Sequence, residues 1–497
     1  MKVSELFGRA GLDFPPELGD IEIETIVTDS RRVTKGSLFI CIEGLHTDGH
    51  GYIDDAIQAG AAVIVAERVR DACVGGAAAF IMLQNTRKAS ALLYNALYGN
   101  PTEKLKIIGV TGTNGKTSVC TLLCELFEAA GHRCGILGTV CCRSAGGVVL
   151  SPQNSDPLAN MTTPDPEQLY PMLAQMAEDG VEYVFMEVTS HALALHKTDA
   201  IEFEVGVFTN LTQDHLDFHG NMESYYQAKR ELFTHCRRAV VNLDDPYGAR
   251  LLREISCPVT TCSADIGDFC ALDVKTRGAA GSIYQMKTPT GSFPVQINIA
   301  GSFSVTNSLL AGAVATECGI SPKVIRAVFA HTKGVCGRME RVSLEGTKGP
   351  IVLIDYAHTP DALEKLLKSV RDFRQTGERI TLVFGCGGDR DRSKRKEMAQ
   401  VASLLSDYVI ITTDNSRSEA PAQILSDIVR GMNKEKPFVV IPDRCKAIRM
   451  AILRAKEQDI VILAGKGHER YEIDGKGRHP FDEREIVKDA LRERTEK

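Results

Sequence analysis

Short apolar runs alternate along this chain with segments in which apolar residues recur at helical spacing. Such alternation is typical of α/β proteins with largely parallel sheets. The apolar runs end in polar or glycine-rich turns, which in such folds place ligand-binding groups at the carboxyl edge of the sheet. The runs predicted as strands are residues 39–42, 61–65, 106–110, 181–187, 205–210, 351–355, 380–385, 408–412 and 459–463.

The same pattern divides the chain into three segments. A turn-rich stretch at residues 99–102 ends the first, a glycine-rich loop belongs to the second, and the third begins near Gly337. A chain of 497 residues is too long for one ordinary hydrophobic core, so about three domains is the natural expectation. We therefore expect domains at residues 1–100, 101–336 and 337–497.

The composition is that of an ordinary globular protein, with 43% hydrophobic and 25% charged residues. The net charge of −6 gives no reason to expect nucleic acid or an anionic membrane as a partner. Any acidic substrate must then be held by local clusters of basic residues. The N-terminus carries Glu5 and no continuous apolar segment, and no apolar run is long enough to cross a bilayer. We expect a cytoplasmic protein without membrane insertion.

The 15 cysteines are scattered, and none of them forms a C-x-x-C pair. An odd number without metal-ligand spacing indicates reduced thiols in a reducing compartment, mostly serving as small apolar residues. Cys120 and Cys124 lie four residues apart on a predicted helix. For this pair we expect core packing rather than half of a metal site.

The most informative chemistry lies at the glycine-rich loop after residue 110. A strand, a glycine-rich turn and a helix in that order aim backbone N–H groups and a helix N-terminus at one point, which stabilises a phosphate. Lys116 can reach the terminal phosphates, and the Thr117 hydroxyl can bind Mg²⁺. The usual spacing requires glycine where Val110 stands, and the alternative is a turn with a surface lysine. We predict a nucleotide site at Gly112, Thr113, Asn114, Gly115, Lys116 and Thr117.

Two further strand ends in the second segment carry polar groups. Glu187 follows an apolar run and can complete a Mg²⁺ shell with Thr117, or it can cap the next helix together with Thr189 and Ser190. Taken alone, this residue leaves both alternatives open. Residues 209–220 contain two aspartates and two histidines, one of them His215, after another predicted strand. Two such strand ends in one segment favour a metal and phosphate site.

Three loops of the third segment each follow a predicted strand. A glycine-rich turn delivers Arg390, which can bind a carboxylate or phosphate through two hydrogen bonds, although charge runs are usually solvated. Together the loops bring two arginines and two acidic groups to one sheet edge. That set suits a zwitterion with amine and carboxylate better than a bare phosphate. The candidate residues are Arg390, Asp414, Asn415, Ser416, Arg417, Gly465 and Glu469.

These motifs resemble those of the Mur ligases. The matching stretches are residues 28–31, 48–50, 111–117, 187–191, 209–217, 337–340, 355–361 and 414–417, which occur in family order along nearly the whole chain up to Glu469. The resemblance implies three α/β domains. They are an N-terminal domain that binds a UDP-sugar, a central P-loop-type ATPase domain with a parallel sheet, and a C-terminal Rossmann-like domain that binds an amino acid.

The resemblance also assigns contacts to the sugar substrate. Where the family often has Gln and Arg after His-x-Leu, this chain has Leu195 and Lys197. Exchanging Arg for Lys gives up a bidentate fork. The residues that match contacts to the UDP-sugar peptide are Ser30, Thr162, Thr163, Thr189 and Lys197.

Lys229 lies in a helical pattern, where a solvated lysine is the ordinary interpretation. The resemblance changes this interpretation, because Lys229 matches the lysine that the family carbamylates with CO₂, and a carbamate is an oxygen ligand for a second Mg²⁺. The implied metal ligands are Thr117, Glu187 and carbamylated Lys229. The implied catalytic residues are Lys116, Glu187, His215 and Lys229, and Asn307 and Arg338 match positions near the nucleotide.

The implied reaction is ATP-dependent amide formation. The glutamyl carboxylate of UDP-N-acetylmuramoyl-L-alanyl-D-glutamate attacks the γ-phosphorus of ATP, and the amine of an amino acid then attacks the acyl phosphate. Members of the family that add meso-diaminopimelate carry Asp-Asn-Pro-Arg, whereas lysine-adding members replace the arginine. Here residues 414–417 keep the arginine. Arg417 and Arg390 would hold the distal carboxylate, and Glu469 an amino group. Lysine would leave Arg417 unpaired, so we expect meso-diaminopimelate.

Three alternatives to this function stay open. One is a lysine-adding ligase of the same family. Another is a folate-polyglutamylating ligase, which has a similar phosphate loop but no reason to carry the first domain or the Asp-Asn-x-Arg loop. The third is a nucleotide-gated scaffold protein without catalysis, against which the intact Lys116, Glu187, His215 and Lys229 count. The sequence leaves the oligomeric state open.

Overall fold

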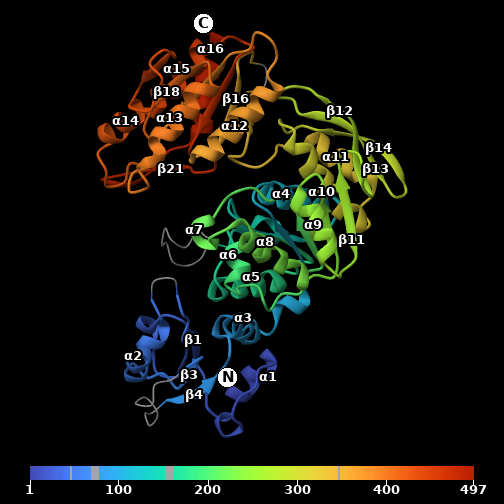
Figure 1. Ribbon diagram of the computed structural model, residues 1–497, viewed down its shortest axis with the longest axis vertical. Helices are drawn as coiled ribbons and strands as arrows, with labels where there is room; N and C mark the ends of the chain where they lie inside the picture. The colour runs from blue at the N-terminus through green and yellow to red at the C-terminus, as the bar shows by residue number, and fades with distance from the viewer. Residues whose placement is uncertain (45–46, 69–77, 151–161, 345–346, 497) are drawn as a thin grey trace. The chain divides into compact units, whose positions relative to one another are not determined.

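The computed structural model describes residues 1–44, 47–68, 78–150, 162–344 and 347–496. Strands and helices alternate along the chain (Figure 1), which confirms the predicted α/β class. The chain forms two compact units, one of residues 1–269 and 310–321 and the other of residues 270–309 and 322–497. Within the described ranges, no helix combines the length and the apolar character that a membrane crossing requires.

The first unit begins with a parallel sheet of four strands in the order β1–β2–β3–β4. Successive side chains of a strand point to opposite faces. Leu38 and Ile40 of β2 therefore pack with α1 and α3, whereas Phe39 packs with α2. The elements are α1 (Val3–Ala10), β1 (Thr25–Val27), β2 (Ser37–Ile40), α2 (Ile53–Gln58), β3 (Val63–Ala66), β4 (Ala79–Met82) and α3 (Thr86–Leu97).

A second sheet of this unit carries the glycine-rich loop. Its strands follow the order β11–β10–β9–β5–β8–β6–β7, and every neighbouring pair from β11 to β6 is parallel. Because β5 lies between β9 and β8, the loops that follow these three strands open at the same edge. The elements are β5 (Lys106–Thr111), α4 (Lys116–Ala129), β6 (Cys134–Leu137), β7 (Cys142–Arg143), α5 (Pro166–Glu178), β8 (Tyr183–Glu187), α6 (Ser190–Ala194), β9 (Val205–Phe208), α7 (Leu216–His219), α8 (Met222–Arg230), β10 (Ala239–Asn242), α9 (Pro246–Glu254) and β11 (Val259–Ser263).

The second unit contains three antiparallel strands and a sheet of six. The six strands follow the order β15–β16–β20–β17–β18–β19, and all pairs except β15–β16 are parallel. The antiparallel strands are β12 (Phe269–Thr276), β13 (Ser282–Thr288) and β14 (Gly291–Ile297), followed by α10 (Phe303–Glu317), which is divided between the units, and α11 (Pro322–His331). The rest are β15 (Glu340–Val342), β16 (Ile351–Asp355), α12 (Pro360–Phe373), β17 (Ile380–Phe384), α13 (Ser393–Leu405), β18 (Tyr408–Ile411), α14 (Pro421–Val429), β19 (Phe438–Val440), α15 (Arg444–Arg454), β20 (Ile460–Ala464), β21 (Tyr471–Asp474), β22 (Gly477–Pro480) and α16 (Glu483–Glu496).

Helices cover both faces of the six-stranded sheet. Leu382 and Phe384 of β17 pack with α12, α13 and α14, whereas Val383 between them packs with α15 and α16. Figure 1 shows α12 and α13 lying across one face of this sheet. With both faces covered, the carboxyl edge of the strands is the natural place for a ligand site.

Every predicted strand is present, and its ends differ from the prediction by no more than two residues. The run at residues 39–42, for example, forms a strand at Ser37–Ile40, because Ser37 pairs with Thr25 of β1. Cys120 and Cys124 are buried in the core, as expected.

A buried ion pair joins α15 to α16. The guanidinium of Arg444 lies 2.8 Å from Glu483 Oε1, and neither side chain is exposed. Arg444 also donates to the carbonyl oxygens of Thr413 and Ala464 at 3.1 and 3.0 Å. A buried charge is costly when it loses its partner, so this pair fixes the packing of the two helices.

We expect Arg444→Met to lower the free energy of unfolding by about 3–5 kcal/mol, because it leaves the Glu483 carboxylate buried without a counter-charge. Adding Glu483→Met should restore part of the loss. Chemical denaturation followed by circular dichroism measures both. Lys446→Met, which removes an exposed ion pair with Asp443, is the matched control and should leave the midpoint unchanged. An equal, small effect of Arg444→Met and the control would contradict this view of the pair.

Candidate active site

The glycine-rich loop joins β5 to α4 and depends on two glycines in the left-handed region. The φ angle is +147° at Gly112 and +88° at Gly115. A Cβ at Gly112 would lie 1.9 Å from Thr209 Oγ1, so a side chain has no room there. Asn210 Oδ1 accepts a hydrogen bond from the Asn114 N–H at 3.0 Å. The loop is thereby tied to the end of the neighbouring strand β9.

Lys116 begins α4 and folds back over the loop. Its Nζ donates to the carbonyl oxygens of Gly112 and Thr113 at 2.8 and 2.9 Å. The first N–H groups of a helix have no carbonyl partner within the helix and carry a partial positive charge. The loop, the helix start and the ammonium together form an arrangement suited to an anion.

Glu187 ends β8, is buried, and accepts hydrogen bonds at both carboxylate oxygens. Thr117 Oγ1 donates to Oε2 at 2.9 Å, and the Thr139 N–H donates to Oε1 at 2.9 Å. A Cβ at Gly138 would lie 2.2 Å from Oε1, so glycine leaves room for the carboxylate. Hydroxyl and carboxylate oxygens are ligands that Mg²⁺ prefers. The pair Thr117–Glu187 therefore fits a hard divalent cation.

The threonines predicted to contact substrate lie beside this carboxylate. Thr162 Oγ1 is 2.9 Å from Thr139 Oγ1. Thr163 Oγ1 donates to the backbone oxygen of Glu187 at 2.8 Å and accepts from the Thr189 N–H at 3.1 Å. The side chain of Thr189, rather than that of Glu187, caps α6. Of the two alternatives for Glu187, the structure thus favours an inward-facing carboxylate at the sheet edge.

Lys229 is only 1% exposed on α8, so the interpretation as a solvated surface lysine is wrong. Its Nζ donates to the carbonyl oxygen of Gly112 at 2.9 Å and lies 4.7 Å from the ring centroid of Tyr225. Burial, and after it the nearby Lys116 ammonium, hold the pKa of Lys229 well below its ordinary value. The lower pKa favours the neutral amine, which is the nucleophilic form.

His215 adopts a φ of +52° just before α7, next to a group of aromatic rings. Its ring packs edge-to-face on His191 with centroids 4.8 Å apart, and its Nε2 lies 3.6 Å from Asp214. Burial lowers the pKa of His215, and burial followed by the charge of neighbouring groups brings the pKa of His219 to about 4. In the described part of the chain, no three His, Cys, Asp or Glu side chains are placed to hold a metal ion by themselves.

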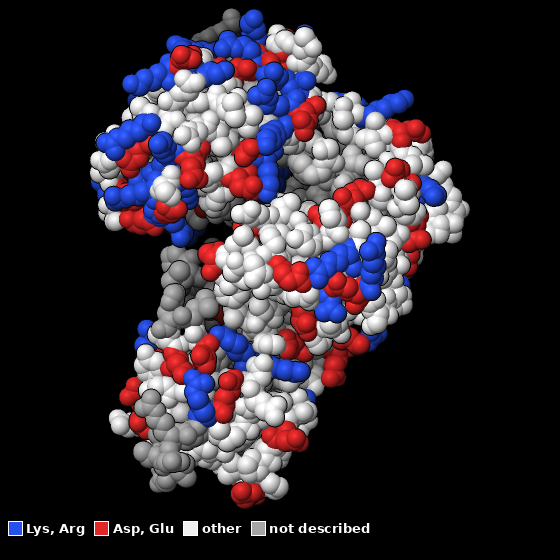
Figure 2. Space-filling model, viewed as in Figure 1, with Lys and Arg blue, Asp and Glu red and all other residues white. Residues whose placement is uncertain are grey.

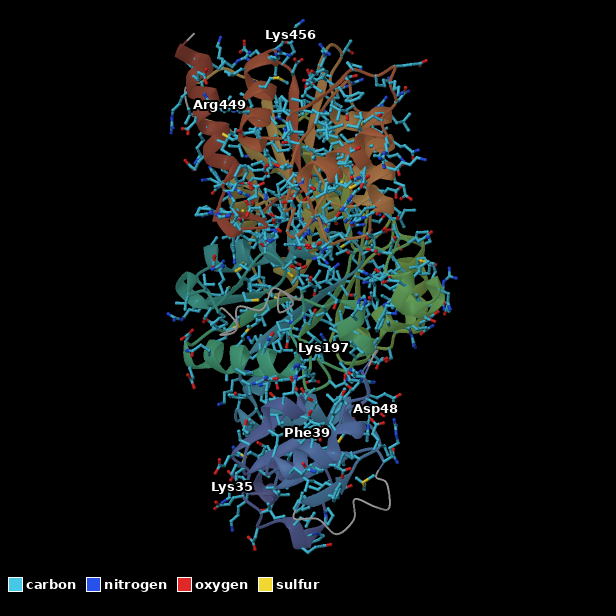
Figure 3. The ribbon with its side chains drawn as sticks, turned by 90° about the vertical axis from the view of Figure 1, so that its left-hand side faces the viewer. Lys35, Phe39, Asp48, Lys197, Arg449 and Lys456 are labelled. Carbon is cyan, nitrogen blue, oxygen red and sulfur yellow. The ribbon has the colours of Figure 1, made fainter. Side chains whose placement is uncertain are left out.

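A pocket of about 570 Å³ lies between residues of the four-stranded sheet and residues around α5 and α6. Its lining includes the predicted residues Ser30 and Lys197, and also Leu195. Phe39 of β2 and Lys197, which follows α6, are two of its lining residues and are labelled in Figure 3. Lys197 Nζ forms an ion pair with Asp165 at 2.7 Å.

Arg87 and Tyr94 are among the pocket residues that the sequence did not single out. Arg87 lines the pocket and donates to the backbone oxygen of Glu43. Burial lowers the pKa of Arg87. Tyr94 also lines the pocket, and its hydroxyl donates to the backbone oxygen of Ile26 at 2.9 Å. Both residues come from α3, whose pattern shows only an amphipathic helix.

Asn307 and Arg338, matched to the nucleotide, belong to the second unit. Asn307 is buried in α10, and the Arg338 guanidinium lies 5.2 Å from the ring centroid of Tyr356. The carboxylate of Asp355 accepts from the N–H of Met339 at 2.8 Å. Burial raises the pKa of Asp355. This carboxyl therefore fixes the segment that carries Arg338.

Two of the loops at the edge of the six-stranded sheet bring the predicted arginines together. A Cβ at Gly387 would lie 2.9 Å from Arg417 Nη1 and 3.9 Å from Arg390 Cγ. Arg417 has a φ of +50°, and its Nη1 donates to the carbonyl oxygen of Gly388 at 2.8 Å. Nε and Nη2 of Arg417 make no hydrogen bond to any residue that the structure describes, and Arg390 is exposed. One edge of the Arg417 fork is thus available for a carboxylate.

The acidic groups of this edge lie in the same loops. Asn415 Nδ2 donates to Glu469 Oε2 at 2.8 Å, and Ser416 beside it is buried. A Cβ at Gly465 would lie 2.4 Å from Asp414 Oδ2, so glycine is needed there. Burial raises the pKa of Glu469. For Asp414, burial is outweighed by the cations of Lys466 and Arg444, which hold its pKa below the ordinary value.

A buried arginine that the sequence analysis passed over supports these loops. Arg395 of α13 binds Glu419 through two hydrogen bonds of 2.8 and 3.2 Å, and Glu419 accepts from the Asp389 N–H at 2.7 Å. This network ties the Arg390 loop to the Arg417 loop. In the charge run around residue 392 nothing distinguishes the buried arginine from its exposed neighbours. On the surface seen in Figure 2, basic and acidic side chains are interspersed.

Comparison with known proteins agrees with this geometry. Family models match at residues 22–95 (Mur ligase family, catalytic domain), 110–315 (Mur ligase middle domain) and 337–467 (Mur ligase, glutamate ligase domain). The chain is 40% identical to the UDP-N-acetylmuramoyl-L-alanyl-D-glutamate--2,6-diaminopimelate ligase of Clostridioides difficile (strain 630), over 99% of each chain. It is 42% identical to the ligase of the same name from Geobacillus kaustophilus (strain HTA426), over 96% of each.

Solved structures extend the comparison. A UDP-N-acetylmuramoyl-L-alanyl-D-glutamate--2,6-diaminopimelate ligase is 30% identical and superposes with a TM-score of 0.71 over 99% of each chain. A folylpolyglutamate synthase of Mycobacterium tuberculosis is 20% identical with a TM-score of 0.58, covering 76% of this chain and 92% of that one, and shows a shared fold alone. With these relatives matched over nearly its whole length, the chain belongs to the Mur ligase family and has its three-domain α/β architecture.

Proposed function

We propose that this protein is an ATP-dependent ligase that joins meso-diaminopimelate to UDP-N-acetylmuramoyl-L-alanyl-D-glutamate in peptidoglycan precursor synthesis. Relatives named for diaminopimelate addition match the chain from end to end at 40% identity. The observation that carries the choice of amino acid is the meeting of Arg390, Arg417 and Glu469 at one sheet edge.

ATP binds, in this proposal, at residues 112–117, with Asn307 and Arg338 as further contacts to the nucleotide. Thr117 and Glu187 fit Mg²⁺, because their oxygens are 2.9 Å apart at the end of β8. When bound, Mg²⁺ neutralises phosphate charge. Lys116 and the loop N–H groups contribute to the same neutralisation as charge develops on the transferring phosphoryl group.

Lys229 is proposed to carry a carbamate derived from CO₂. Carbamylation needs a neutral amine, and the buried position of Lys229 beside the Lys116 ammonium favours that form. A carbamate would place oxygen atoms beside the loop, where they could serve as ligands for a second Mg²⁺. Conversion of the ammonium into an anion would also remove the repulsion between the two lysines.

The reaction runs in two steps. The glutamyl carboxylate attacks the γ-phosphorus of ATP, which forms an acyl phosphate and releases ADP. The amine of meso-diaminopimelate then attacks the acyl carbon, an amide forms, and phosphate leaves. His215 is proposed as a catalytic residue beside the phosphate-binding loop, where burial favours its neutral form.

The UDP-sugar peptide is proposed to occupy the 570 Å³ pocket. Ser30 would contact the uridine side of the substrate, and Lys197 stands where the family often has an arginine. The threonines Thr162, Thr163 and Thr189 would contact the peptide end, because they lie at the same strand end as Glu187. Arg87 adds a cation for the diphosphate, a role for which its place in the pocket lining is suitable.

Meso-diaminopimelate is favoured over lysine by the unpaired edge of Arg417. A distal carboxylate can accept two charge-assisted hydrogen bonds from that edge and can also meet Arg390. Lysine has no such carboxylate, and its ammonium would meet two cations. Glu469, with Asp414, Asn415, Ser416 and Gly465 around it, is proposed to bind an amino group.

Folate polyglutamylation is the less well supported reaction, because the solved folylpolyglutamate synthase covers only 76% of this chain and is 20% identical.

We further propose domain boundaries near residues 100 and 336. The division into two compact units instead groups residues 270–309 with the C-terminal part. Since ATP and UDP-sugars are cytoplasmic metabolites, we propose that the protein acts in the cytoplasm.

Lys116→Ala should abolish ATP turnover while leaving the fold intact, because the ammonium donates to the loop carbonyls of Gly112 and Thr113 and is proposed to neutralise the transferring phosphate. Amino-acid-dependent phosphate release measures the loss. Lys106→Ala, at the opposite and exposed end of β5, is the control and should keep full activity. Near-normal phosphate release from folded Lys116→Ala would refute the nucleotide-site assignment.

Lys229→Ala should nearly abolish activity, and added bicarbonate should not restore it, because alanine cannot form the proposed metal-binding carbamate. In the wild type, ¹³C-labelled bicarbonate should give a carbamate signal by ¹³C NMR that is missing from the variant. Gln227→Ala, an exposed position on the same helix, controls for helix stability. A wild type without the signal, together with a fully active Lys229→Ala, would overturn the proposal.

Arg417→Ala and Arg417→Lys should raise the meso-diaminopimelate concentration for half-maximal phosphate release, with ATP saturating. Losing a bidentate bond to a charged group costs about 1.5–3 kcal/mol, hence roughly tenfold to a hundredfold. Arg430→Ala, which removes an exposed arginine of the same unit, should change nothing. An unchanged half-saturating concentration in both Arg417 variants, or a wild type that prefers lysine, would show that this loop does not bind the distal carboxylate.

A further inference from the structure

Lys466 is a buried cation that neither the mechanism nor the sequence analysis uses. Its side chain has no exposed surface, and it follows β20 between two glycines. Its Nζ donates to Asn415 Oδ1 at 3.0 Å and to the backbone oxygen of Tyr471 at 3.0 Å, and it lies 3.9 Å from Asp414 Oδ1. Burying an ammonium is costly even when it is paired. An apolar side chain would fill this space at lower cost, so the charge calls for an explanation.

The explanation lies in the orientation of the Asn415 amide. Its Oδ1 receives two donors, Lys466 Nζ at 3.0 Å and the Ile473 N–H at 2.9 Å. Neither donor tolerates the NH₂ end of the amide, so Nδ2 must point the other way. In that direction Nδ2 donates to Glu469 Oε2 at 2.8 Å. The position of the Glu469 carboxylate thus depends on a chain of contacts that begins at Lys466.

A backbone hydrogen bond also connects Lys466 with Glu469. The Glu469 N–H donates to the backbone oxygen of Lys466 at 2.9 Å, and Gly467 between them has a φ of +52°. Lys466 and Glu469 therefore belong to one tight turn, while the Lys466 side chain reaches across to the loop after β18 and to β21. Lys466 therefore links three segments of the sheet edge: the turn after β20, the loop after β18, and β21.

We propose that Lys466 is a positioning residue for the amino group of the amino-acid substrate: it orients Asn415, and through Asn415 it places Glu469. This inference rests on the proposed function, since it assigns to Glu469 the binding of an ammonium group. Lys466 itself stays behind the site and touches no substrate. Its charge also balances that of Asp414, whose pKa it helps to lower.

The test separates positioning from mere stability. Lys466→Met and Lys466→Gln should each raise the half-saturating concentration of meso-diaminopimelate by roughly tenfold to a hundredfold, with little change in kcat or in the half-saturating concentration of ATP. Asn415→Ala should give a similar rise. In the Asn415→Ala background, Lys466→Met should add less than about threefold, because the two residues act through one chain of contacts. Arg449→Met, which breaks a partly exposed ion pair with Glu493 in the same unit, is the control (Figure 3).

The results that would overturn the proposal are distinct from failure of the proposed function. If the wild type releases no phosphate in response to meso-diaminopimelate, the function is wrong. If the wild type is active, the inference is wrong when both Lys466 variants keep the wild-type value for meso-diaminopimelate, or when ATP and meso-diaminopimelate values rise together. It is also wrong if the effects of Lys466→Met and Asn415→Ala multiply, or if both Lys466 variants unfold below the assay temperature, since the lysine is then a structural residue.

Discussion

Two lysine ammonium groups donate to one carbonyl oxygen, and the carboxyl edge of the sheet that contains β5 is organised around this point. The Gly112 oxygen accepts from Lys116 at 2.8 Å and from Lys229 at 2.9 Å. Two like charges at such separations repel unless an anion lies between them or one of them loses its proton. A bound phosphate would meet the first condition, and the lowered pKa of Lys229 favours the second.

At the carboxyl edge of the six-stranded sheet, buried charges are balanced in a different way. Its buried cations each have an acidic partner within the protein. Lys466 lies near Asp414, Arg444 is paired with Glu483, and Arg395 is paired with Glu419. These pairs leave the fork of Arg417 with an open edge. Because the supporting charges are already balanced, only the few remaining groups, such as the open edge of Arg417, need to match the charges of a zwitterionic substrate. Small displacements of those groups then change substrate specificity more than the stability of the fold.

The sequence predicts the elements much better than the supporting contacts. Strands such as Ile351–Asp355 are recognised because a short apolar run between turns has few other uses in an α/β chain. Among the strands that escape prediction, β12, β13 and β14 have large exposed parts with polar side chains, whereas β6 and β10 are buried runs of only four residues. Burial of Lys229 cannot be inferred from its helical pattern, since it arises from packing against a loop more than a hundred residues earlier in the chain. The same holds for Lys466, whose partner Asn415 lies in another loop.

Long-range contacts therefore decide which charged residues do chemistry in this fold. Nothing in the local sequence distinguishes Arg395, which is fully buried, from Arg392, which is exposed, although both approach Glu419. The difference comes from α13, which turns Arg395 toward the sheet edge and Arg392 toward solvent. With a net charge of −6, the protein as a whole repels anionic substrates slightly, and screening limits that effect to short range. Affinity for phosphates and carboxylates must then come from cations held at the two sheet edges by packing, where low polarisability of the surroundings strengthens each contact.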